Sequence, residues 1–167
     1  VGVLSNSNIP MASPQVLASA VCMDKRFTKI ALKGLGIKAL PYIYAEKQAD
    51  LSVVQNKLGF PVVVKPNKSG SSIGITVAED YNSLVRSFNF AKSYGEGVII
   101  EPKLQDFLEI NCAGYQTSKG VLISECEQPV GRCDLLTFSD KYKDGKRIFP
   151  AKIPKKISDK IQKLTEK

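Results

Sequence analysis

The sequence contains no histidine, and its 167 residues include only four cysteines, Cys22, Cys112, Cys126 and Cys133. No two of these cysteines form a Cys-x-x-Cys pair. Paired cysteines and histidines are the usual zinc ligands, and a disulfide framework needs a denser and more regular set of cysteines. The sequence therefore argues against a zinc site and a disulfide framework, and we expect reduced thiols that mostly lie in the interior.

Long apolar runs and targeting signals are also missing. No stretch approaches the roughly 20 apolar residues that a membrane-spanning helix needs. Residues 1–15 contain no basic region followed by an apolar one, as a secretory leader would. With 43% hydrophobic and 24% charged residues, the sequence is typical of a globular protein of about one domain, and we expect it in the cytoplasm, with no membrane partner.

Negative charge is in deficit: 24 basic residues face 16 acidic ones, a net charge of +8. Such an excess fits nucleic acid, a membrane surface or a small polyanion such as a polyphosphate. The densest basic cluster, residues 150–167, places Ile157, Ile161 and Leu164 at helical spacing and predicts an amphipathic helix with solvated lysines. The cluster has no aromatic residue for base stacking, so a non-catalytic nucleic-acid module is kept only as an alternative.

The first part of the chain predicts helices. Ser13 and Pro14 indicate a helix start, and Gly34 and Gly36 indicate its end, as one long helix or two short ones. The stretch GLGIKA at 34–39 matches a loose dinucleotide-binding fingerprint. That fingerprint belongs between a strand and a helix, whereas this stretch ends a helix, so we reject it.

The remaining signals mix strands and helices and predict an α+β fold. Pro41 indicates that the strand near it lies at a sheet edge, and Gly59 indicates the end of a short helix. We expect strands at 37–46, 98–101, 107–116 and 120–129, and the last two should form a hairpin. We expect helices at 49–59 and 80–97. The second of these helices carries four apolar residues on one face: Leu84, Val85, Phe88 and Ala91.

The stretch GFPVVVKPNKSGSSIGITVAED, residues 59–80, is the most informative. Its first strand is apolar up to Val64, so Lys65 emerges where the strand leaves the core and can direct a cation at a ligand. In the loop that follows, Gly70 and Gly74 free backbone N–H groups and serine hydroxyls add donors, a combination suited to phosphate oxygens. Because a second strand follows, the loop is a hairpin tip, which excludes a Walker-type loop.

Four stretches, GFPVVVKPNKSGSSIGI, MDKRFTK, VIIEPKL and TFSDKY, together resemble the ATP-grasp enzymes and are most similar to the D-alanine–D-alanine ligases. The resemblance covers nearly the whole chain and is weaker after Glu101. It implies an ATP-grasp fold and an ATP-dependent ligase that joins two D-alanines through an acylphosphate for peptidoglycan synthesis. The alternatives are a D-alanine–D-lactate or D-alanine–D-serine ligase, or another ATP-grasp carboxylate–amine ligase.

The resemblance also implies roles for individual residues around the phosphates of ATP. Lys29 and Lys65 match the two lysines that hold the phosphates. Gly70, Ser71 and Ser72 match the loop that closes over them. Ser71 matches, in addition, a serine that orients substrate beside the reaction centre.

For the adenosine part, the resemblance implies a hinge at residues 101–104. Glu101 is its acidic residue, and Pro102 departs from the family pattern because proline has no backbone N–H. The donor to adenine is therefore expected from Lys103 or Leu104. Glu109 matches the acid that accepts the ribose hydroxyls, although the spacing from Glu101 is one residue longer than in many relatives.

At the far end of the site, Lys141 matches a further phosphate-side lysine and Tyr142 a tyrosine near the substrate. The family uses Mg²⁺, whose ligands we expect outside this chain, so no residue here is assigned to the metal. The substrates implied are ATP and D-alanine, with no nucleic acid, and dimers are usual in the family.

The resemblance divides the chain into three parts. Residues 1–17 match the end of an N-terminal substrate domain, 18–100 the ATP-grasp lid domain, and 101–167 the beginning of the C-terminal domain. We therefore expect an internal fragment of a ligase that is inactive by itself.

Overall fold

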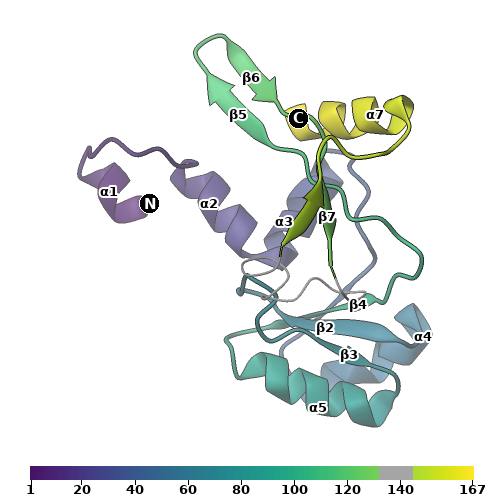
Figure 1. Ribbon diagram of the computed structural model, residues 1–167. Helices are drawn as coiled ribbons and strands as arrows, with labels where there is room; N and C mark the ends of the chain where they lie inside the picture. Colours follow the sequence, from purple (N-terminus) through teal and green to yellow (C-terminus); the bar gives the residue numbers. More distant parts are fainter. Residues whose placement is uncertain (132–144) are drawn as a thin grey trace. The chain divides into compact units, whose positions relative to one another are not determined.

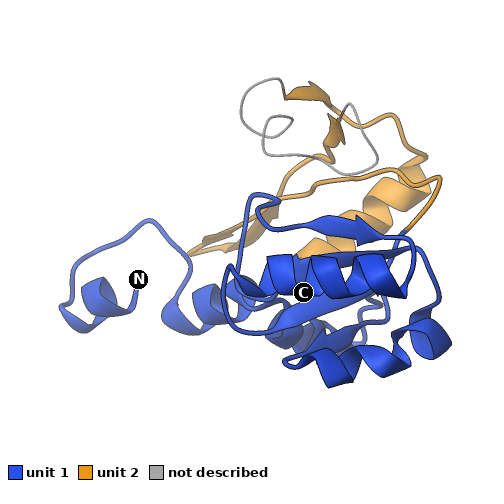
Figure 2. Ribbon diagram, turned by 90° about the horizontal axis from the view of Figure 1, so that it is seen from below, with its two compact units in different colours: residues 1–103 blue, residues 104–167 orange. Residues whose placement is uncertain are grey.

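The computed structural model describes residues 1–131 and 145–167. These residues form two compact units, residues 1–103 and residues 104–167, which Figure 2 shows in different colours. Each unit has its own strands and helices. Cys133, Lys141 and Tyr142 lie outside the described residues.

Helices open the first unit, and Asp24 separates two of them. They are α1 (Gly2–Asn6), α2 (Val16–Met23) and α3 (Lys25–Gly34). Asp24 has an extended backbone, and its carboxylate accepts a hydrogen bond of 3.0 Å from the N–H of Phe27. A side chain that satisfies a free N–H group in the first turn starts a new helix there. The segment predicted as one long helix or two short ones therefore forms two short helices.

The predicted helix start at Ser13 is wrong by two residues. Gln15, with an extended backbone, precedes the first residue of α2. The Ser13 hydroxyl donates to the Pro14 carbonyl at 3.1 Å, and the Ser19 hydroxyl donates to the same oxygen at 3.2 Å. The Ser13 side chain is thus engaged locally and caps no helix.

A four-stranded antiparallel sheet with the order β1-β4-β2-β3 forms the centre of the first unit (Figure 1). Its strands are β1 (Ile43–Ala45), β2 (Val62–Pro66), β3 (Thr76–Ala78) and β4 (Val98–Pro102). The helical segments around it are η1 (Gln48–Val53), α4 (Val54–Leu58) and α5 (Tyr81–Lys92). The short strand after Pro41 is an edge strand, and the loop of the 59–80 stretch joins the paired strands β2 and β3, as the sequence predicts.

One face of this sheet packs against α5 and forms the core. Side chains alternate between the two faces of a strand, so Val62 and Val64 point to one face while Val63 and Lys65 point to the other. Phe88 is the largest of the fully buried side chains on the core side. The cluster consists of Ala45, Leu51, Val54, Val62, Val64, Ala78, Leu84, Phe88, Ala91, Val98 and Ile100. The face opposite the core is therefore the one that can carry polar side chains of β2 and β4.

The described residues of the second unit form two hairpin-like strand pairs and a helix. Its elements are β5 (Gly114–Thr117), β6 (Gly120–Ile123), β7 (Gln128–Val130), β8 (Lys146–Ile148) and α7 (Lys155–Glu166). β5 pairs with β6 as the predicted hairpin, across the turn TSKG at residues 117–120, and β7 pairs with β8. The strands are shorter than predicted because the pairing shifts by one residue between Gly114↔Ile123 and Asn111↔Glu127. An extra residue on one strand interrupts a ladder as a bulge does.

The apolar face predicted for the last helix is only partly buried. Ile157 and Leu164 are 44% and 38% exposed. The contacts that α7 makes in its unit include polar ones: the Ser158 hydroxyl donates to Cys126 Sγ at 3.5 Å, and the Gln162 amide donates to the Ser124 carbonyl at 2.9 Å.

Of the three described cysteines, only one lies fully in the interior, where most of them were predicted to lie. Cys126 is buried, Cys112 is half-buried and Cys22 is exposed. Cys22 lies on α2, which buries none of its residues. The apolar sequence around Cys22 indicated burial, but every residue of this helix stays at least partly exposed.

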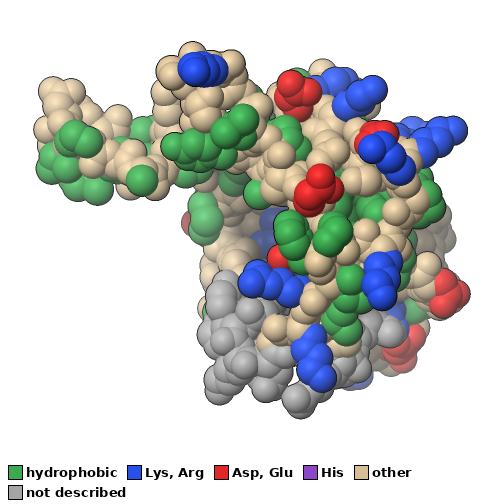
Figure 3. Space-filling view, turned by 45° about the horizontal axis from the view of Figure 1, so that its top comes forward, with side chains coloured by type: hydrophobic (Ala, Val, Ile, Leu, Met, Phe, Trp, Pro, Cys, Tyr) green, Lys and Arg blue, Asp and Glu red, His purple; other side chains and the backbone are tan. Residues whose placement is uncertain are grey.

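Apolar side chains are also exposed along the N-terminal helices α1 and α2, on the segment that extends to the left in Figure 3. Val3 and Leu17 are about four-fifths exposed, at 80% and 77%. Among the described residues, no helix is both long and apolar enough to cross a membrane.

Candidate functional site

Two lysines from separate elements contact one buried carboxylate on the sheet face opposite the core. Lys65 on β2 is directly opposite Ile99 on β4, and Glu101 lies two residues further along β4. Residues two apart on a strand point to the same face, so Lys65 and Glu101 are diagonal neighbours that long side chains can bridge. The Lys65 ammonium forms an ion pair with Oε2 of Glu101, and the Lys29 ammonium, from α3, forms one with Oε1.

The ion pairs determine the charge state of Glu101, whose residue is 5% exposed. Burial by itself would raise its pKa. Attraction to Lys65 and hydrogen bonds from Lys29 and Lys65 outweigh burial and hold the pKa of Glu101 below its usual value. The carboxylate is therefore ionised at neutral pH, and two cations on one anion leave an excess of positive charge at this point.

Further contacts hold the Lys29 side chain in place. Its ammonium donates to the Leu40 carbonyl at 3.2 Å and lies 5.2 Å from the centre of the Tyr42 ring. A cation within about 6 Å of an aromatic face is attracted by the ring. The position of the charge is thus set by groups from α3, the segment before β1, and β4.

The loop after β2 has an unusual backbone. Ser71 and Ser72 have φ angles of 53° and 60°, and Gly74 has 75°, whereas Gly70 lies outside this region. The left-handed conformation is uncommon for residues other than glycine and costs on the order of 1 kcal/mol each. At this turn the two serines adopt it, and Gly70 does not.

Hydrogen bonds inside the loop explain this conformation. The Ile73 N–H donates to the Gly70 carbonyl at 3.0 Å, which closes a turn with Ser71 and Ser72 at its centre. The Ser69 hydroxyl donates to the Ile73 carbonyl at 2.9 Å across the same turn. The loop is therefore a defined structure rather than an open hairpin tip.

The loop is also tied to α3 and β4 through Asn67, which is 2% exposed. The Asn67 N–H donates to the Gly97 carbonyl at 3.0 Å, and its Oδ1 accepts from the Arg26 N–H at 2.9 Å. No sequence motif indicated this role of Asn67. An asparagine between a strand-ending proline and a Gly/Ser loop was the available signal, because its side chain readily accepts from a nearby helix N-terminus.

In the hinge at residues 101–104, one of the two backbone N–H groups expected to donate to adenine already has a partner within the protein. The Lys103 N–H donates to the Pro61 carbonyl at 3.0 Å and so extends the pairing of β4 with the start of β2. Of the two predicted donors to adenine, the Lys103 N–H is therefore already used. Leu104 and Glu109 belong to the second unit and are both exposed.

The described residues of the first unit thus bring together Lys29, Lys65 and Glu101, next to the loop that contains Gly70, Ser71 and Ser72. Ammonium groups and a loop of small residues are what an anion with several oxygens requires.

Comparison with known proteins identifies the family. The family model described as "D-ala D-ala ligase C-terminus" matches residues 31–167. The chain belongs to this D-Ala-D-Ala ligase family. The resemblance on which the sequence analysis relied is confirmed.

Individual family members are similar over most of the chain. A D-alanine–D-alanine ligase of Wigglesworthia glossinidia brevipalpis is 33% identical over 99% of this chain, which covers 48% of that protein. A D-alanine–D-alanine ligase of Helicobacter pylori is 36% identical over 83% of the chain and 40% of its own length. The chain spans about half the length of the curated relatives that it matches.

Solved structures confirm the predicted α+β, ATP-grasp fold. A D-alanine–D-alanine ligase from Helicobacter pylori superposes with a TM-score of 0.80 and 26% identity over 98% of this chain and 47% of that one. The VanG D-Ala:D-Ser ligase from Enterococcus faecalis has a TM-score of 0.85 at 23% identity, over 98% of this chain and 48% of that one. At this identity the second comparison shows the fold alone.

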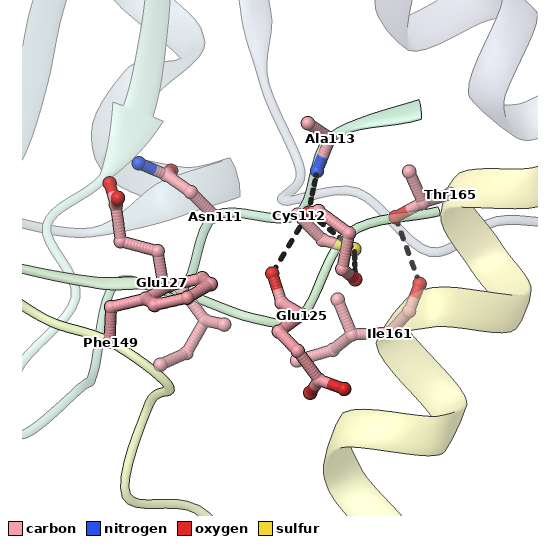
Figure 4. A pocket seen from close by; sticks show the side chains of 10 residues that line it. Asn111, Cys112, Ala113, Glu125, Glu127, Phe149, Ile161 and Thr165 are labelled. Atoms are coloured by element: carbon pink, nitrogen blue, oxygen red, sulfur yellow. Dashed lines mark hydrogen bonds between the residues drawn. The ribbon is translucent and has the colours of Figure 1, made fainter. Parts of the chain in front are cut away.

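The second unit of this ligase-family chain contains a hollow of about 600 Å³ (Figure 4). Asn111, Cys112, Glu125, Phe149 and Ile161 are among the residues around it. None of the predicted site residues that the structure describes lines it. The Ala113 N–H donates to the Ser124 hydroxyl beside it at 2.9 Å. Nothing in its lining indicates a particular ligand.

A metal site is a separate question. Within residues 1–131 and 145–167, no three or more acidic, cysteine or histidine side chains gather in a group that could hold a metal ion. We therefore assign no described residue of this family member to a metal ion.

Proposed function

We propose that this chain forms the phosphate-binding side of an ATP-dependent D-alanine–D-alanine ligase. The observation that supports this most is the convergence of Lys29 and Lys65 on Glu101, beside a loop of glycine and serine. The ligase family to which the chain belongs is the second support. The whole protein's activity is part of the proposal, since the chain spans only about half the length of its relatives.

In the proposed reaction, a carboxylate oxygen of one D-alanine attacks the γ-phosphorus of ATP, and the bond to the ADP oxygen breaks. The amine of a second D-alanine then attacks the acyl carbon, phosphate leaves, and the amine loses a proton. The negative charge on the phosphate oxygens opposes the attack, and positioned cations lower the activation barrier by stabilising that charge. Lys29 and Lys65 supply these cations, and Glu101, the acidic residue of the implied adenine hinge, fixes both ammonium groups at one carboxylate.

The other predicted residues complete the proposal. Gly70, Ser71 and Ser72 cover the phosphates, and Ser71 orients the substrate. Leu104 donates its N–H to adenine, because the Lys103 N–H is already bonded to Pro61.

Three further predicted roles depend on residues away from the first unit. Glu109 accepts the ribose hydroxyls. Lys141 contacts a phosphate oxygen and Tyr142 lies at the substrate end, both outside the described residues. No step of this proposal is assigned to Mg²⁺.

The test is phosphate release from ATP by the whole protein, measured with D-alanine as the first substrate. We expect release that requires D-alanine and a D-alanyl-D-alanine product identified by mass spectrometry. Faster release with D-lactate or D-serine as the second substrate would move the assignment to the related ligases. Absence of ATP binding in a folded protein, or binding of a polynucleotide that falls steeply with salt, would overturn the proposal.

A cytoplasmic location and a homodimer belong to the same proposal. So does the division into the end of a substrate domain (1–17), a lid domain (18–100) and the beginning of a C-terminal domain (101–167). Light scattering on the purified protein tests the dimer, which requires a mass twice that of the chain.

A further inference from the structure

Lys25, to which the sequence analysis gave no role, anchors the loop that follows β2. Its ammonium donates to the carbonyl of Pro66 at 2.8 Å and of Asn67 at 3.3 Å, and also to the carbonyl of Ser69. An ammonium group has three N–H donors and no acceptor. All three donors are thus directed at the backbone of one short segment.

The backbone of Lys25 contributes to the same anchor. Its N–H donates to the Asn67 carbonyl at 3.2 Å, next to the bond from the Arg26 N–H to the Asn67 side chain. The first turn of α3 therefore contacts the loop start through both backbone and side chains. The hydrogen bonds reach as far as Ser69, directly before the turn of Ser71 and Ser72.

The surroundings of the Lys25 side chain disfavour its charged form. Burial, and then repulsion from Lys65, lower the pKa of Lys25, while Asp24 and Glu101 act in the opposite direction. A cation that is half-buried near a second cation is unfavourable unless its hydrogen bonds compensate. The three carbonyls provide that compensation.

We propose that Lys25 is a positioning residue that holds the loop of residues 67–74 in register with Lys29. This inference rests on the proposed function and extends it. Lys25 and Lys29 are one helical turn apart on α3 and so lie on the same face of the helix. One helix thereby carries both a phosphate-binding cation and the anchor of the loop that covers the phosphates.

Direct phosphate binding by Lys25 is the competing reading. Its three N–H groups already donate to carbonyl oxygens, so a phosphate contact would require one of these bonds to break. The two readings predict different kinetics. A positioning residue affects turnover more than ATP affinity, whereas a phosphate ligand affects both.

The experiment compares Lys25→Met with Lys33→Met, a substitution of an exposed lysine on the same helix. Hydrogen exchange is measured first, without nucleotide, so that the anchor is tested whatever the protein's substrate. We expect exchange of amides in residues 67–74 to become at least about tenfold faster in Lys25→Met, with β4 and α5 unchanged. Lys33→Met should match the wild type. Unchanged exchange in the loop of a folded Lys25→Met protein would overturn the inference.

Kinetics then connect the anchor to function. In Lys25→Met we expect kcat to fall about tenfold or more while KM for ATP changes less than about threefold. An equal loss of ATP affinity would favour direct phosphate binding and overturn the positioning role. Loop exchange that responds in a protein without ATP binding would leave the anchor intact and reject the proposed function alone.

A measurement on the wild type covers the case in which Lys25→Met does not fold. Proton exchange of each lysine ammonium group can be followed by NMR at low temperature. We expect the Lys25 ammonium to exchange at least about tenfold more slowly than that of Lys33, because its protons are held by carbonyls. Equal rates would show that the anchor does not exist in solution.

Discussion

Lys65 and Glu101 lie diagonally across the antiparallel pair β2 and β4, on the sheet face that does not pack against α5. The same strand register that buries Val62, Val64 and Ile100 places these two charges together on the other side. A shift of one residue in this pairing would exchange the two faces. The stability of the core and the position of the ion pair are therefore set by one strand register.

Replacement of Lys65 by alanine tests the phosphate role. We expect ATP affinity to fall about tenfold to a hundredfold, because a charge-assisted hydrogen bond contributes about 1.5–3 kcal/mol. Calorimetric titration with ATP gives the affinity. Lys68→Ala, which removes an exposed lysine from the same loop, should bind ATP as the wild type does. Equal affinities for the Lys65 variant and the wild type would contradict the role.

Ser71→Ala tests whether the loop serine orients substrate. Turnover should fall by about tenfold or more while the affinity for ATP changes little, because substrate orientation acts on the chemical step. Steady-state phosphate release and ATP titration separate the two effects. Ser118→Ala, in the exposed turn between β5 and β6, is the matched control. A serine with a purely structural role would leave turnover intact.

Gly74→Ala tests the packing of the loop. A Cβ at this position would lie 2.7 Å from Pro66 Cγ and 2.8 Å from Tyr94 Cδ2, at a φ of 75°. We expect the free energy of unfolding to fall by about 1–3 kcal/mol in chemical denaturation. A Cβ at Gly70 would have no neighbour within 4 Å. The free energy of unfolding of Gly70→Ala should therefore lie within about 0.5 kcal/mol of the wild-type value. Similar losses in both variants would show that the loop packs differently.

The lowered pKa of Glu101 predicts how the free energy of unfolding depends on pH. Because its folded-state pKa is lowered below the ordinary 4.5, its ionised form stabilises the fold above that pH. This contribution should decrease as the pH falls from about 4.5 through the lower folded-state value. Glu101→Gln should be less stable at neutral pH by on the order of 2 kcal/mol, since it leaves two facing lysines.

Denaturation of Glu101→Gln between pH 3 and pH 7 should also show a flatter pH dependence than the wild type. Glu96→Gln, at an exposed position before β4, should reproduce the wild-type curve. A parallel decline in all three proteins would mean that Glu101 is not the group responsible.

The local pattern of residues was enough for the elements and the family. The continuous apolar run up to Val64 predicted the buried strand, and apolar positions at helical spacing predicted α5, because a helix has a fixed period. Gly59 ended a helix where a positive φ is required. These are effects of neighbours in sequence, and a single sequence contains them.

Only the tertiary structure decided how distant residues meet. That Glu101 bridges Lys29 and Lys65, that the Lys103 N–H is taken by Pro61, and that Lys25 anchors the loop all depend on strand register and on the docking of α3. A lysine has the same propensities whether it binds a phosphate or three backbone carbonyls. Its role is set by which acceptors lie within hydrogen-bonding distance, and residues far apart in the chain supply them.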